Sequence, residues 1–507
     1  CEKQAATAPA DGYTPVPGLD TGKKAELTIA IPYETNKALN TAANAFMSKY
    51  PNVSVRLQYV EDYDKNAVQM LQDNAIDIIL QKDIDYGEYT MVDEKTQEAV
   101  PAGKTTDDYF YNFALDTEID FSDTTPDITD NYRHVRVDEA GKEIVCQYSY
   151  PLGGETRGVF VNKTLLAAYG LTVPANYAEF LACCETLKQN GLIPVQGAGD
   201  TAAFSLGLAP AANAVTHDSA ALARMAAAEP GVSADFEPTL RKLYTLATKR
   251  YFDYKAVEQL GYFLSTNELG QSMSFLGLKT DEATLETIKP ENGYGYAAFL
   301  PYNSSMGAVI RSLIEQYSLT TDVEFICSPL NDEGTGRAAY ITPYYGLCAN
   351  KNSANLLWIR EFVNFIFKAE NNKVYAAEAA VLPNTKDVLQ LAAEKYGLNP
   401  ETDVTLCGQI RFSDTYNGFS PISTALKNVL KGSAQKYMVN LNKDENGNIQ
   451  YETDETGRRF LYLGDEKTVV YEEYVGEEDS AMPGYAFCTM AYYLDGMEAS
   501  FAAYRVE

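Results

Sequence analysis

The sequence is poor in histidine and in basic side chains, and both shortages limit the functions that the protein can have. It contains two histidines, His134 and His217, so a histidine-based zinc site is not expected. Lys and Arg total 41 against 70 Asp and Glu, which gives a formal net charge of -29. Such a surface repels phosphate backbones and argues against nucleic acid as a partner. No apolar run is long enough to span a bilayer, so no transmembrane helix is expected.

The sequence also lacks the usual signatures of an enzyme. It has no G-x-S-x-G, no G-x-x-x-x-G-K and no Cys–His pair that its two histidines serve. No metal site and no cofactor are therefore expected. The 70 carboxylates keep a glycoside-processing enzyme open as an alternative, because that chemistry needs a pair of acids.

Cysteine is scarce and its spacing predicts neither a metal site nor a disulfide framework. There are 8 cysteines and no C-x-x-C. Apart from Cys1 they lie in apolar runs such as "LCANK" and "AFCTMA", which is typical of small buried hydrophobes. These seven residues are Cys146, Cys183, Cys184, Cys327, Cys348, Cys407 and Cys488.

The chain of 507 residues is too long for one core and predicts two large lobes. Strands at 26–31, 53–60 and 76–81 alternate with helices at 36–50 and 63–73, which indicates a parallel sheet flanked by helices. Ligands bind such sheets beyond the carboxyl ends of the strands. Those ends are "PYETN" after the first strand and "QKDID" after the third.

Two features are more simply explained by structure than by ligand binding. Trp358, the only tryptophan, falls in a helix that is apolar nearly all round, which favours a core position. The segment around Asn442, Asp444 and Asn446 imitates a calcium loop, but Thr453 stands where a bidentate carboxylate is required. Asn446-Gly447 between alternating residues predicts a hairpin instead, within 440–463.

The first residue and the segment after it suggest a membrane anchor. Cys1 is followed by "EKQAATAPADGYTPVPGLDTGKKAE", whose composition suits a flexible tether over residues 1–24. This arrangement resembles a bacterial lipoprotein after signal-peptide removal, in which Cys1 carries the lipid. The protein is then expected on the outer face of the cell membrane, held there through the lipid on Cys1.

Four stretches together resemble one protein family. They are the Cys1 tether, the opening "AFMSKYPNVSVRLQYV", the segment "GKEIVCQYSYPLGGETRGVFVNKTLLAAYGLTVPANYAEFLACCETLKQNGLIPV", and "SPLNDEGTG" followed by "YYGLCANKNSANLLWIREFVNFIFKAENNKVYAAEAAVLPNT". They resemble the family 1 extracellular solute-binding proteins of ABC transporters, relatives of maltose-binding protein. The resemblance extends from residue 26 to about 430 with gaps.

The resemblance implies an α/β, periplasmic-binding-protein-like type II fold with two lobes, each a mixed sheet flanked by helices. The chain crosses between the lobes more than once, and Gly153 and Gly154 are implied as hinge residues that allow unusual φ/ψ. The implied lobes are 25–152 plus 331–382 for lobe I and 153–330 plus 383–507 for lobe II. The C-terminal 75 or so residues match no pattern we recognise.

The resemblance also implies where a ligand binds. Glu155 would face the cleft from the hinge, although pairing with Arg157 is an alternative for its carboxylate. The other implied ligand-binding residues are Tyr33, Glu34, Lys82, Asp83, Phe204, Tyr344, Tyr345 and Phe419, with Asp85 and Tyr86 in reserve. The chain departs from many sugar binders at Gly277, where Leu278 and Lys279 follow instead of a tryptophan.

These observations predict a non-catalytic, monomeric binding protein that closes on a small solute and delivers it to an ABC permease. Stacking rings and polar groups favour a mono- or oligosaccharide. One alternative is a surface glycan-binding receptor or adhesin without a transport role. Two further alternatives are a binder of a non-sugar solute and a glycoside-processing enzyme.

Overall fold

The chain divides into two compact units that are interleaved in sequence. The computed structural model describes residues 12–93, 95–196, 199–252, 268–280, 285–287, 297–410, 419–465 and 467–505. Unit 1 consists of Cys1–Glu155 and Thr342–Val388, and unit 2 of Thr156–Ile341 and Leu389–Glu507. The chain therefore passes from one unit to the other three times.

The unit boundaries differ from the predicted lobes at three short segments. Residues 153–155 and 383–388 belong to unit 1, and residues 331–341 to unit 2. The reason is strand pairing: Gly153 and Gly154 pair with Pro383 and Leu382, which keeps both partners in unit 1. Residues 339–341 pair with a strand of unit 2 and stay there.

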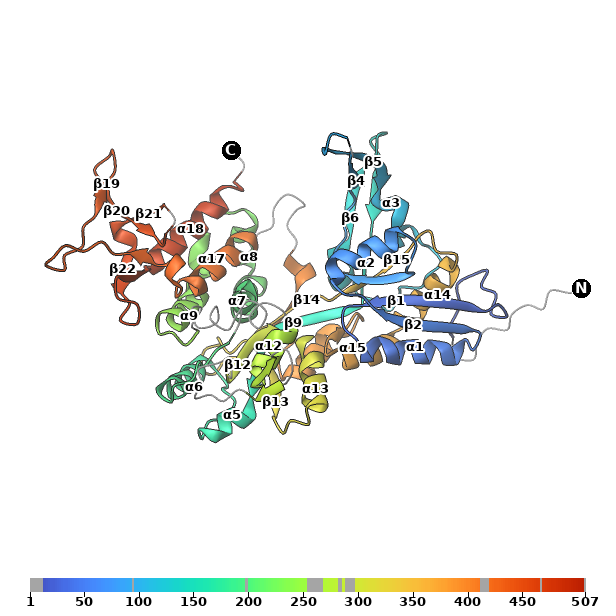
Figure 1. Cartoon of the computed structure of the whole chain (residues 1–507), viewed down its shortest axis with the longest axis horizontal. Coiled ribbons are helices and arrows are strands. Elements are labelled where there is room, and N and C mark those ends of the chain that lie inside the picture. Colours follow the sequence, from blue (N-terminus) through green and yellow to red (C-terminus); the bar gives the residue numbers. More distant parts are fainter. Residues whose placement is uncertain are drawn as a thin grey trace, which may run out of the picture. The chain divides into compact units, whose positions relative to one another are not determined.

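Unit 1 is built on a five-stranded sheet in the order β2-β1-β3-β15-β8 (Figure 1). Strand β1 runs parallel to β2 and β3, whereas β15 runs antiparallel to β3 and β8. The strands are β1 Ala25–Ile31, β2 Val53–Tyr59, β3 Ile78–Gln81, β8 Tyr150–Pro151 and β15 Gly346–Ala349. The longer helices of the unit are α1 Lys37–Lys49, α2 Tyr63–Gln72, α14 Leu356–Ile366 and α15 Ala369–Ala379.

Residues 86–140 show little periodicity in the sequence, and insertions or short helices are expected there. The described residues between 86 and 146 form two ribbons and short helices. Figure 1 shows the β4–β5 and β6–β7 ribbons extending away from the five-stranded sheet of unit 1. The elements are β4 Glu88–Val92, β5 Ala99–Thr105, α3 Thr106–Tyr109, η1 Phe113–Leu115, α4 Pro126–Thr129, η2 Asp130–Tyr132, β6 His134–Val137 and β7 Glu143–Cys146.

An aromatic cluster and a buried carboxylate fix the core of unit 1. Trp358 is 7% exposed and its ring centroid lies 6.3 Å from that of Phe46 and 5.3 Å from that of Tyr50. The predicted core position of Trp358 is confirmed. Glu361 on the same helix is fully buried and accepts hydrogen bonds from the hydroxyls of Tyr13 and Tyr50. These bonds supply the partners that a buried carboxylate needs.

Unit 2 contains a second mixed sheet, β12-β9-β14-β17, with β13 also paired to β9. Its strands are β9 Gly153–Asn162, which starts in unit 1, β12 Phe299–Asn303, β13 Val323–Cys327, β14 Ala339–Pro343 and β17 Val404–Leu406; a two-residue strand of unit 1, β16 Leu382–Pro383, pairs with the start of β9. A separate ribbon joins β10 Leu278–Thr280 to β11 Leu285–Thr287. The mixed α/β class predicted from the sequence is confirmed.

Helices make up much of unit 2. They are α5 Lys163–Ala168, α6 Tyr177–Gln189, α7 Gly199–Thr216, α8 Ser219–Ala226, η3 Val232–Asp235, α9 Glu237–Thr248, α12 Glu268–Phe275, α13 Met306–Gln316, α16 Val388–Tyr396 (which begins at the last residue of unit 1), η5 Cys407–Ile410, α17 Phe419–Lys431 and α18 Met490–Ala502. Helix α17 packs against α7, α9 and α18.

The C-terminal residues fold as a further sheet within unit 2. Its order is β19-β20-β18-β23-β22, with β21 paired to β20. The elements are η6 Gln435–Tyr437, β18 Val439–Asn440, β19 Glu452–Thr453, β20 Arg459–Leu463, β21 Thr468–Tyr471, η7 Glu472–Tyr474, β22 Val475–Glu478 and β23 Tyr485–Cys488.

The segment that imitates a calcium loop is a tight turn. Gly447 has φ +84° and the carboxylate of Asp444 accepts hydrogen bonds from the backbone N–H groups of Asn446 and Asn448. A second turn follows at Gly457, with φ +86°, between β19 and β20. Oδ1 of Asp444 is therefore bonded to the backbone of its own turn, and Oδ2 accepts from the side-chain amides of Asn448 and Gln450.

The seven described cysteines are all buried and unpaired, as the apolar runs around them predict. Burial raises the pKa of the Cys327, Cys348 and Cys488 thiols to about 12. No helix in the described ranges combines the length and the apolar character needed to cross a membrane.

A buried ion pair joins the C-terminal sheet to the rest of unit 2. The Nε of Arg250 donates to Oδ2 of Asp479 at 2.7 Å, and the side chains are 7% and 6% exposed. We expect Asp479→Ala to lower the free energy of unfolding by about 3–5 kcal/mol, because it leaves a buried guanidinium without its carboxylate.

The matched control is Glu472→Ala, which breaks the exposed Arg459–Glu472 pair in the same sheet. It should change stability by less than about 1 kcal/mol. Urea denaturation of both variants measures the difference, and equal effects would contradict a structural role for the buried pair.

Candidate functional site

A lysine and a buried carboxylate meet at the carboxyl end of β3. The Nζ of Lys82 lies 3.1 Å from Oε1 of Glu155. The Glu155 side chain is 3% exposed and that of Lys82 is 48% exposed, so one partner reaches solvent while the other is buried. The structure thus pairs Glu155 with Lys82. Arg157, the alternative partner, has its guanidinium 5.7 Å from the ring centroid of Phe204.

Two tyrosines complete this group. The Nζ of Lys82 lies 5.3 Å from the ring centroid of Tyr345, a cation–π distance. The ring of Tyr344 stands perpendicular to that of Tyr345, with 5.4 Å between centroids. Both tyrosines are half-buried. Four of the predicted ligand-binding residues therefore lie together in unit 1.

Backbone hydrogen bonds hold the tyrosines beside the start of β9. The N–H of Leu152 donates to the carbonyl of Tyr345 at 3.0 Å, and that of Tyr344 donates to the carbonyl of Gly153 at 2.8 Å. The hydroxyl of Tyr132 donates to the carbonyl of Tyr344 at 3.1 Å. The segment that carries the rings is thereby fixed in position.

Gly153 and Gly154 lie at the start of β9, and the structure gives a reason for the first of them that differs from the predicted one. Neither residue has a positive φ, so the expectation of unusual φ/ψ is wrong. Both continue β9 and pair with β16. A Cβ on Gly153 would lie 2.4 Å from the carbonyl oxygen of Leu382, which no side chain tolerates. Close approach of two strands, and not backbone freedom, demands this glycine. A hinge role for the pair stays a prediction.

Asp83, the neighbour of Lys82, is engaged by a histidine. The Nε2 of His134, on β6, lies 2.7 Å from Oδ1 and 2.8 Å from Oδ2 of Asp83. Its Nδ1 lies 3.8 Å from Oδ1 of Asp85. The loop after β3 is therefore tied to the β6–β7 ribbon. No group of three or more acidic, cysteine or histidine side chains in the described ranges is arranged to hold a metal ion.

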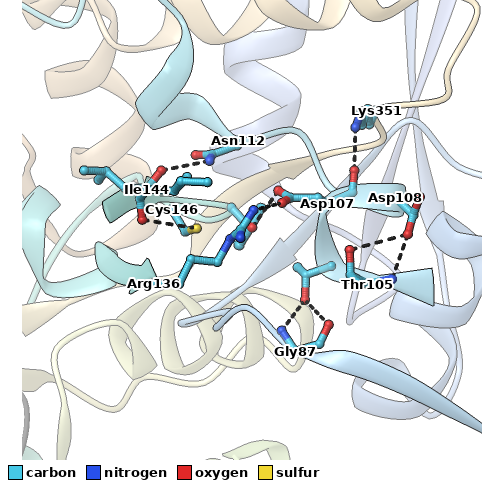
Figure 2. A network of polar contacts seen from close by, with 12 residues as sticks. Gly87, Thr105, Asp107, Asp108, Asn112, Arg136, Ile144, Cys146 and Lys351 are labelled. Carbon is cyan, nitrogen blue, oxygen red and sulfur yellow. Dashed lines mark hydrogen bonds and ion pairs between the residues drawn. The ribbon is translucent and has the colours of Figure 1, made fainter. Parts of the chain in front are cut away.

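A second contact between β6 and the same loop runs through Arg136. Its guanidinium lies 4.2 Å from the ring centroid of Tyr86. The Nη2 atom donates to Oδ2 of Asp107 at 2.8 Å, as Figure 2 shows. His134 and Arg136 are two residues apart on one strand and therefore point to the same side. Together they hold both ends of the loop from Asp83 to Tyr86.

Asp107 is itself fixed by the surrounding network (Figure 2). The hydroxyl of Tyr148 donates to its Oδ1 at 2.7 Å, and the Nζ of Lys351 donates to its backbone carbonyl at 2.6 Å. Burial, together with hydrogen bonds to Cys146 and Asp107, raises the pKa of Tyr148. The phenol therefore stays protonated and remains a donor. Asp107 is therefore held by hydrogen bonds to both its carboxylate and its backbone carbonyl.

Tyr33 and Glu34 share the edge of the sheet at which Lys82 lies. They follow β1, which is parallel to β3 with Ile29 opposite Ile78. Parallel strands end at the same edge, so the topology of the sheet brings these predicted residues to the side of the group. Tyr33 is 36% exposed and Glu34 is exposed.

The remaining predicted ligand-binding residues, Phe204 and Phe419, belong to unit 2. Phe204, on α7 of unit 2, is half-buried, and the Nζ of Lys427 lies 6.0 Å from its ring centroid. Phe419 is the first residue of α17, and its side chain lies outside the described residues, as does the whole of Cys1.

Comparison with known proteins decides the family. Residues 32–373 match the model of the bacterial extracellular solute-binding proteins, which is more than half of the chain. The chain belongs to this family. No curated protein matches it. The match ends at residue 373, so it does not include α16 to α18 or the C-terminal sheet.

Solved structures of binding proteins also resemble this solute-binding protein, at low identity. A manno-oligosaccharide specific binding protein from Bifidobacterium animalis subsp. lactis, in complex with mannotriose, shares 15% identity; the match covers 82% of this chain and 91% of that one, with TM-score 0.49. The GacH receptor of Streptomyces glaucescens shares 16% identity over 81% and 94%, with TM-score 0.47. Maltose-bound MalE3 of T. maritima shares 12% identity over 81% and 95%, with TM-score 0.47.

Three residues that hold the loop beside Lys82 in this solute-binding protein were not predicted from the sequence. They are His134, Arg136 and Asp107, which lie between residues 86 and 140, where insertions or short helices are expected. The only signal is the alternation in "HVRV", which places two polar residues on one side of a short strand. Nothing in the sequence identifies Asp83, Tyr86 or Asp107 as their partners.

The Lys82–Glu155 pair of this solute-binding protein predicts a specific pattern of stabilities. Lys82→Met leaves Glu155 buried without this cation and should destabilise the protein by about 1–2 kcal/mol, less than for a fully buried pair because Lys82 is half in water. Lys82→Met combined with Glu155→Gln should recover most of the loss.

Thermal or urea denaturation of the two single variants and the double variant forms a double-mutant cycle. Arg56→Met is the control, because it breaks the exposed Arg56–Glu26 pair of the same unit. A coupling energy near zero between Lys82 and Glu155 would count against the pair.

Proposed function

We propose that this protein is the substrate-binding component of an ABC importer and that it binds a carbohydrate at the carboxyl edge of the unit 1 sheet. The observation that supports this most is the group formed by Lys82, Glu155, Tyr344 and Tyr345. It combines half-buried aromatic rings with a donor and an acceptor of opposite charge. A sugar presents an apolar C–H face and hydroxyl groups, and it needs both kinds of partner.

The charged pair suits hydroxyl groups in particular. An ammonium donates three hydrogen bonds and a carboxylate only accepts, so each sugar hydroxyl can bond to both. Hydrogen bonds to charged groups are roughly twice as strong as neutral ones. Lys82 is 48% exposed and can turn toward a ligand while Glu155 stays in place.

The contacts that hold the loop from Asp83 to Tyr86 favour binding. Asp83 and Tyr86 are held by His134 and Arg136, and Arg136 is held by Asp107. A site that is ordered before the ligand arrives loses less conformational entropy on binding. A micromolar dissociation constant, about -8 kcal/mol, is then within reach of a few rings and charge-assisted hydrogen bonds.

The other parts of the proposal rest on the sequence. Delivery to a permease, a monomeric state and a lipid on Cys1 accord with the family, which is extracellular. Closure of the two units on the solute, near Gly153 and Gly154, is part of the same proposal. The C-terminal residues beyond the family match favour one alternative, a surface glycan receptor without a transport role.

Tyr345→Ala is expected to weaken carbohydrate binding. Loss of the ring should lower the affinity about tenfold to hundredfold, or about 1.4–2.8 kcal/mol, because it removes the apolar surface on which the sugar stacks. Tyr345→Phe should keep most of the affinity. A thermal-shift screen of mono- and oligosaccharides identifies the ligand, and isothermal titration calorimetry then measures both variants.

Tyr504→Ala is the control for that experiment, since Tyr504 is as exposed as Tyr33 but follows α18 in unit 2. It should leave the affinity unchanged. Equal affinities of the wild-type protein and Tyr345→Ala for the identified sugar would refute the proposed site.

A binding protein returns its ligand unaltered, and this separates it from a glycoside-processing enzyme. We expect the sugar identified by thermal shift to give the same NMR spectrum before and after long incubation with stoichiometric protein. Appearance of a reducing end or of shorter saccharides would show catalysis. Binding without any dependence of cell uptake on the protein would favour the receptor without transport.

A further inference from the structure

A groove of about 350 Å³ opens between α17 and α18 in the part of unit 2 that lies beyond the family match. Figure 1 shows these two helices, near the C-terminal end of the colour scale, in the same unit, and they pack against each other. Helix α17 contributes Pro421, Thr424, Ala425 and Asn428, which helical spacing places on one face. Helix α18 and η7 supply the other wall.

Gly496 keeps the groove open. It lies in the interior of α18, where glycine lowers helix stability. A Cβ at this position would meet nothing within 4 Å, so close packing does not require the glycine. Gly432 of the same unit is different, because a Cβ there would lie 2.5 Å from the hydroxyl oxygen of Tyr493. The absence of a side chain at Gly496 leaves open space, and no neighbouring atom needs that space for a close contact.

Three tyrosines form an aromatic wall of the groove. The ring centroids of Tyr474 and Tyr492 lie 5.8 Å apart, and those of Tyr492 and Tyr493 lie 5.3 Å apart. Both pairs are nearly perpendicular, and at these distances the rings touch one another edge to face. The rings therefore make one continuous surface and do not enclose a space between them, as a cage for a cation would.

Polar groups surround this wall. The hydroxyl of Tyr474 donates to Oδ2 of Asp495 at 2.6 Å, and Oδ1 of that carboxylate has no partner in the described part of the chain. The hydrogen bond to Asp495 and burial raise the pKa of Tyr474, so its hydroxyl stays protonated. Asn428 and Thr424 are exposed at the rim and offer amide and hydroxyl groups.

The charge of the groove selects its ligand. The described residues that line it include the carboxylate of Asp495 and neither lysine nor arginine. The whole chain carries a net charge of -29, so phosphates, sulfates and carboxylates are repelled. A neutral ligand that stacks on tyrosine and donates hydroxyl protons to Asp495 fits this lining.

We propose that the groove between α17 and α18 is a second binding site, for a neutral saccharide of one or two rings. Its volume lies near the lower end of the roughly 300–1,000 Å³ that ligand sites occupy, which suits this size. The site is built from residues beyond 373 and is separate from the group around Lys82. The proposal of this second site can therefore be tested independently of the proposed transport site.

The test uses the full-length chain with Tyr345→Ala, so that binding at the proposed transport site is weakened. Saturation-transfer NMR with glucose, mannose, galactose, maltose and cellobiose, each at millimolar concentration, detects the second site. We expect signals from at least one of these sugars. Adding Gly496→Leu should reduce the groove's share of these signals about tenfold or more, because the new side chain starts from a Cβ position in open space and occupies the groove.

Asp495→Asn is a second variant, on an exposed residue, and should also reduce the signal. Tyr504→Ala, beyond the end of α18, is the matched control and should leave it unchanged. Circular dichroism confirms that each variant is folded. The proposal is overturned by the absence of any sugar signal, by signals that Gly496→Leu leaves undiminished, or by groove-dependent binding of tetramethylammonium in place of sugars.

The two proposals fail in different ways. If Gly496→Leu abolishes sugar binding in the wild-type background while Tyr345→Ala does not alter it, the groove is a saccharide site and the transport site is misplaced. If Tyr345→Ala removes all binding, the transport site stands and the groove does not bind sugar.

Discussion

Burial of the Glu155 carboxylate is the constraint around which the candidate site is arranged. A carboxylate removed from water needs a cation or several donors close by, or it destabilises the fold by several kcal/mol. Lys82 meets that need from the end of β3. The pairing of β9 with β16 brings Glu155 to this place, and the absence of a side chain at Gly153 permits that pairing. The N–H of Leu152 donates to the carbonyl of Tyr345, and this hydrogen bond holds Tyr345 beside the start of β9.

Local patterns predicted the parts of the fold that depend on neighbours in sequence. The alternation of strand and helix at the start of the chain gave β1, α1, β2, α2 and β3 nearly at their observed bounds. The apolar character of the helix around Trp358 placed that residue correctly in the core. Both predictions rest on periodicity, which a single sequence carries in full.

Contacts between distant segments were less accessible. Strand β15, which begins at residue 346, pairs with β3, which ends at residue 81. No local sequence pattern predicts that these two strands are neighbours. The resemblance to a family implied Lys82, Glu155 and Tyr345 as ligand-binding residues. It did not predict that Lys82 pairs with Glu155. The β6–β7 ribbon was not predicted because both strands have only four residues. Val135 and Val137 of β6 are exposed, so the strand has no buried apolar face that the sequence could reveal.

The unusual backbone expected at Gly153 and Gly154 is absent for an instructive reason. A glycine is compatible with an unusual backbone, with a close approach and with an open space, and the sequence looks the same in all three cases. In this protein Gly447 adopts a positive φ, Gly153 allows two strands to meet, and Gly496 leaves a helix face empty. Only coordinates separate these uses.

The seven buried thiols have a practical consequence for anyone who wishes to watch this protein work. All seven side chains are buried, which shields their sulfur atoms from a maleimide dye. The thiols of Cys327, Cys348 and Cys488, whose pKa burial raises to about 12, also hold their protons at neutral pH. With Cys1 replaced, a pair of cysteines introduced on the surfaces of the two units would take up fluorophores selectively. The native chain thus provides a low background for testing by energy transfer the proposal that the two units close on a solute.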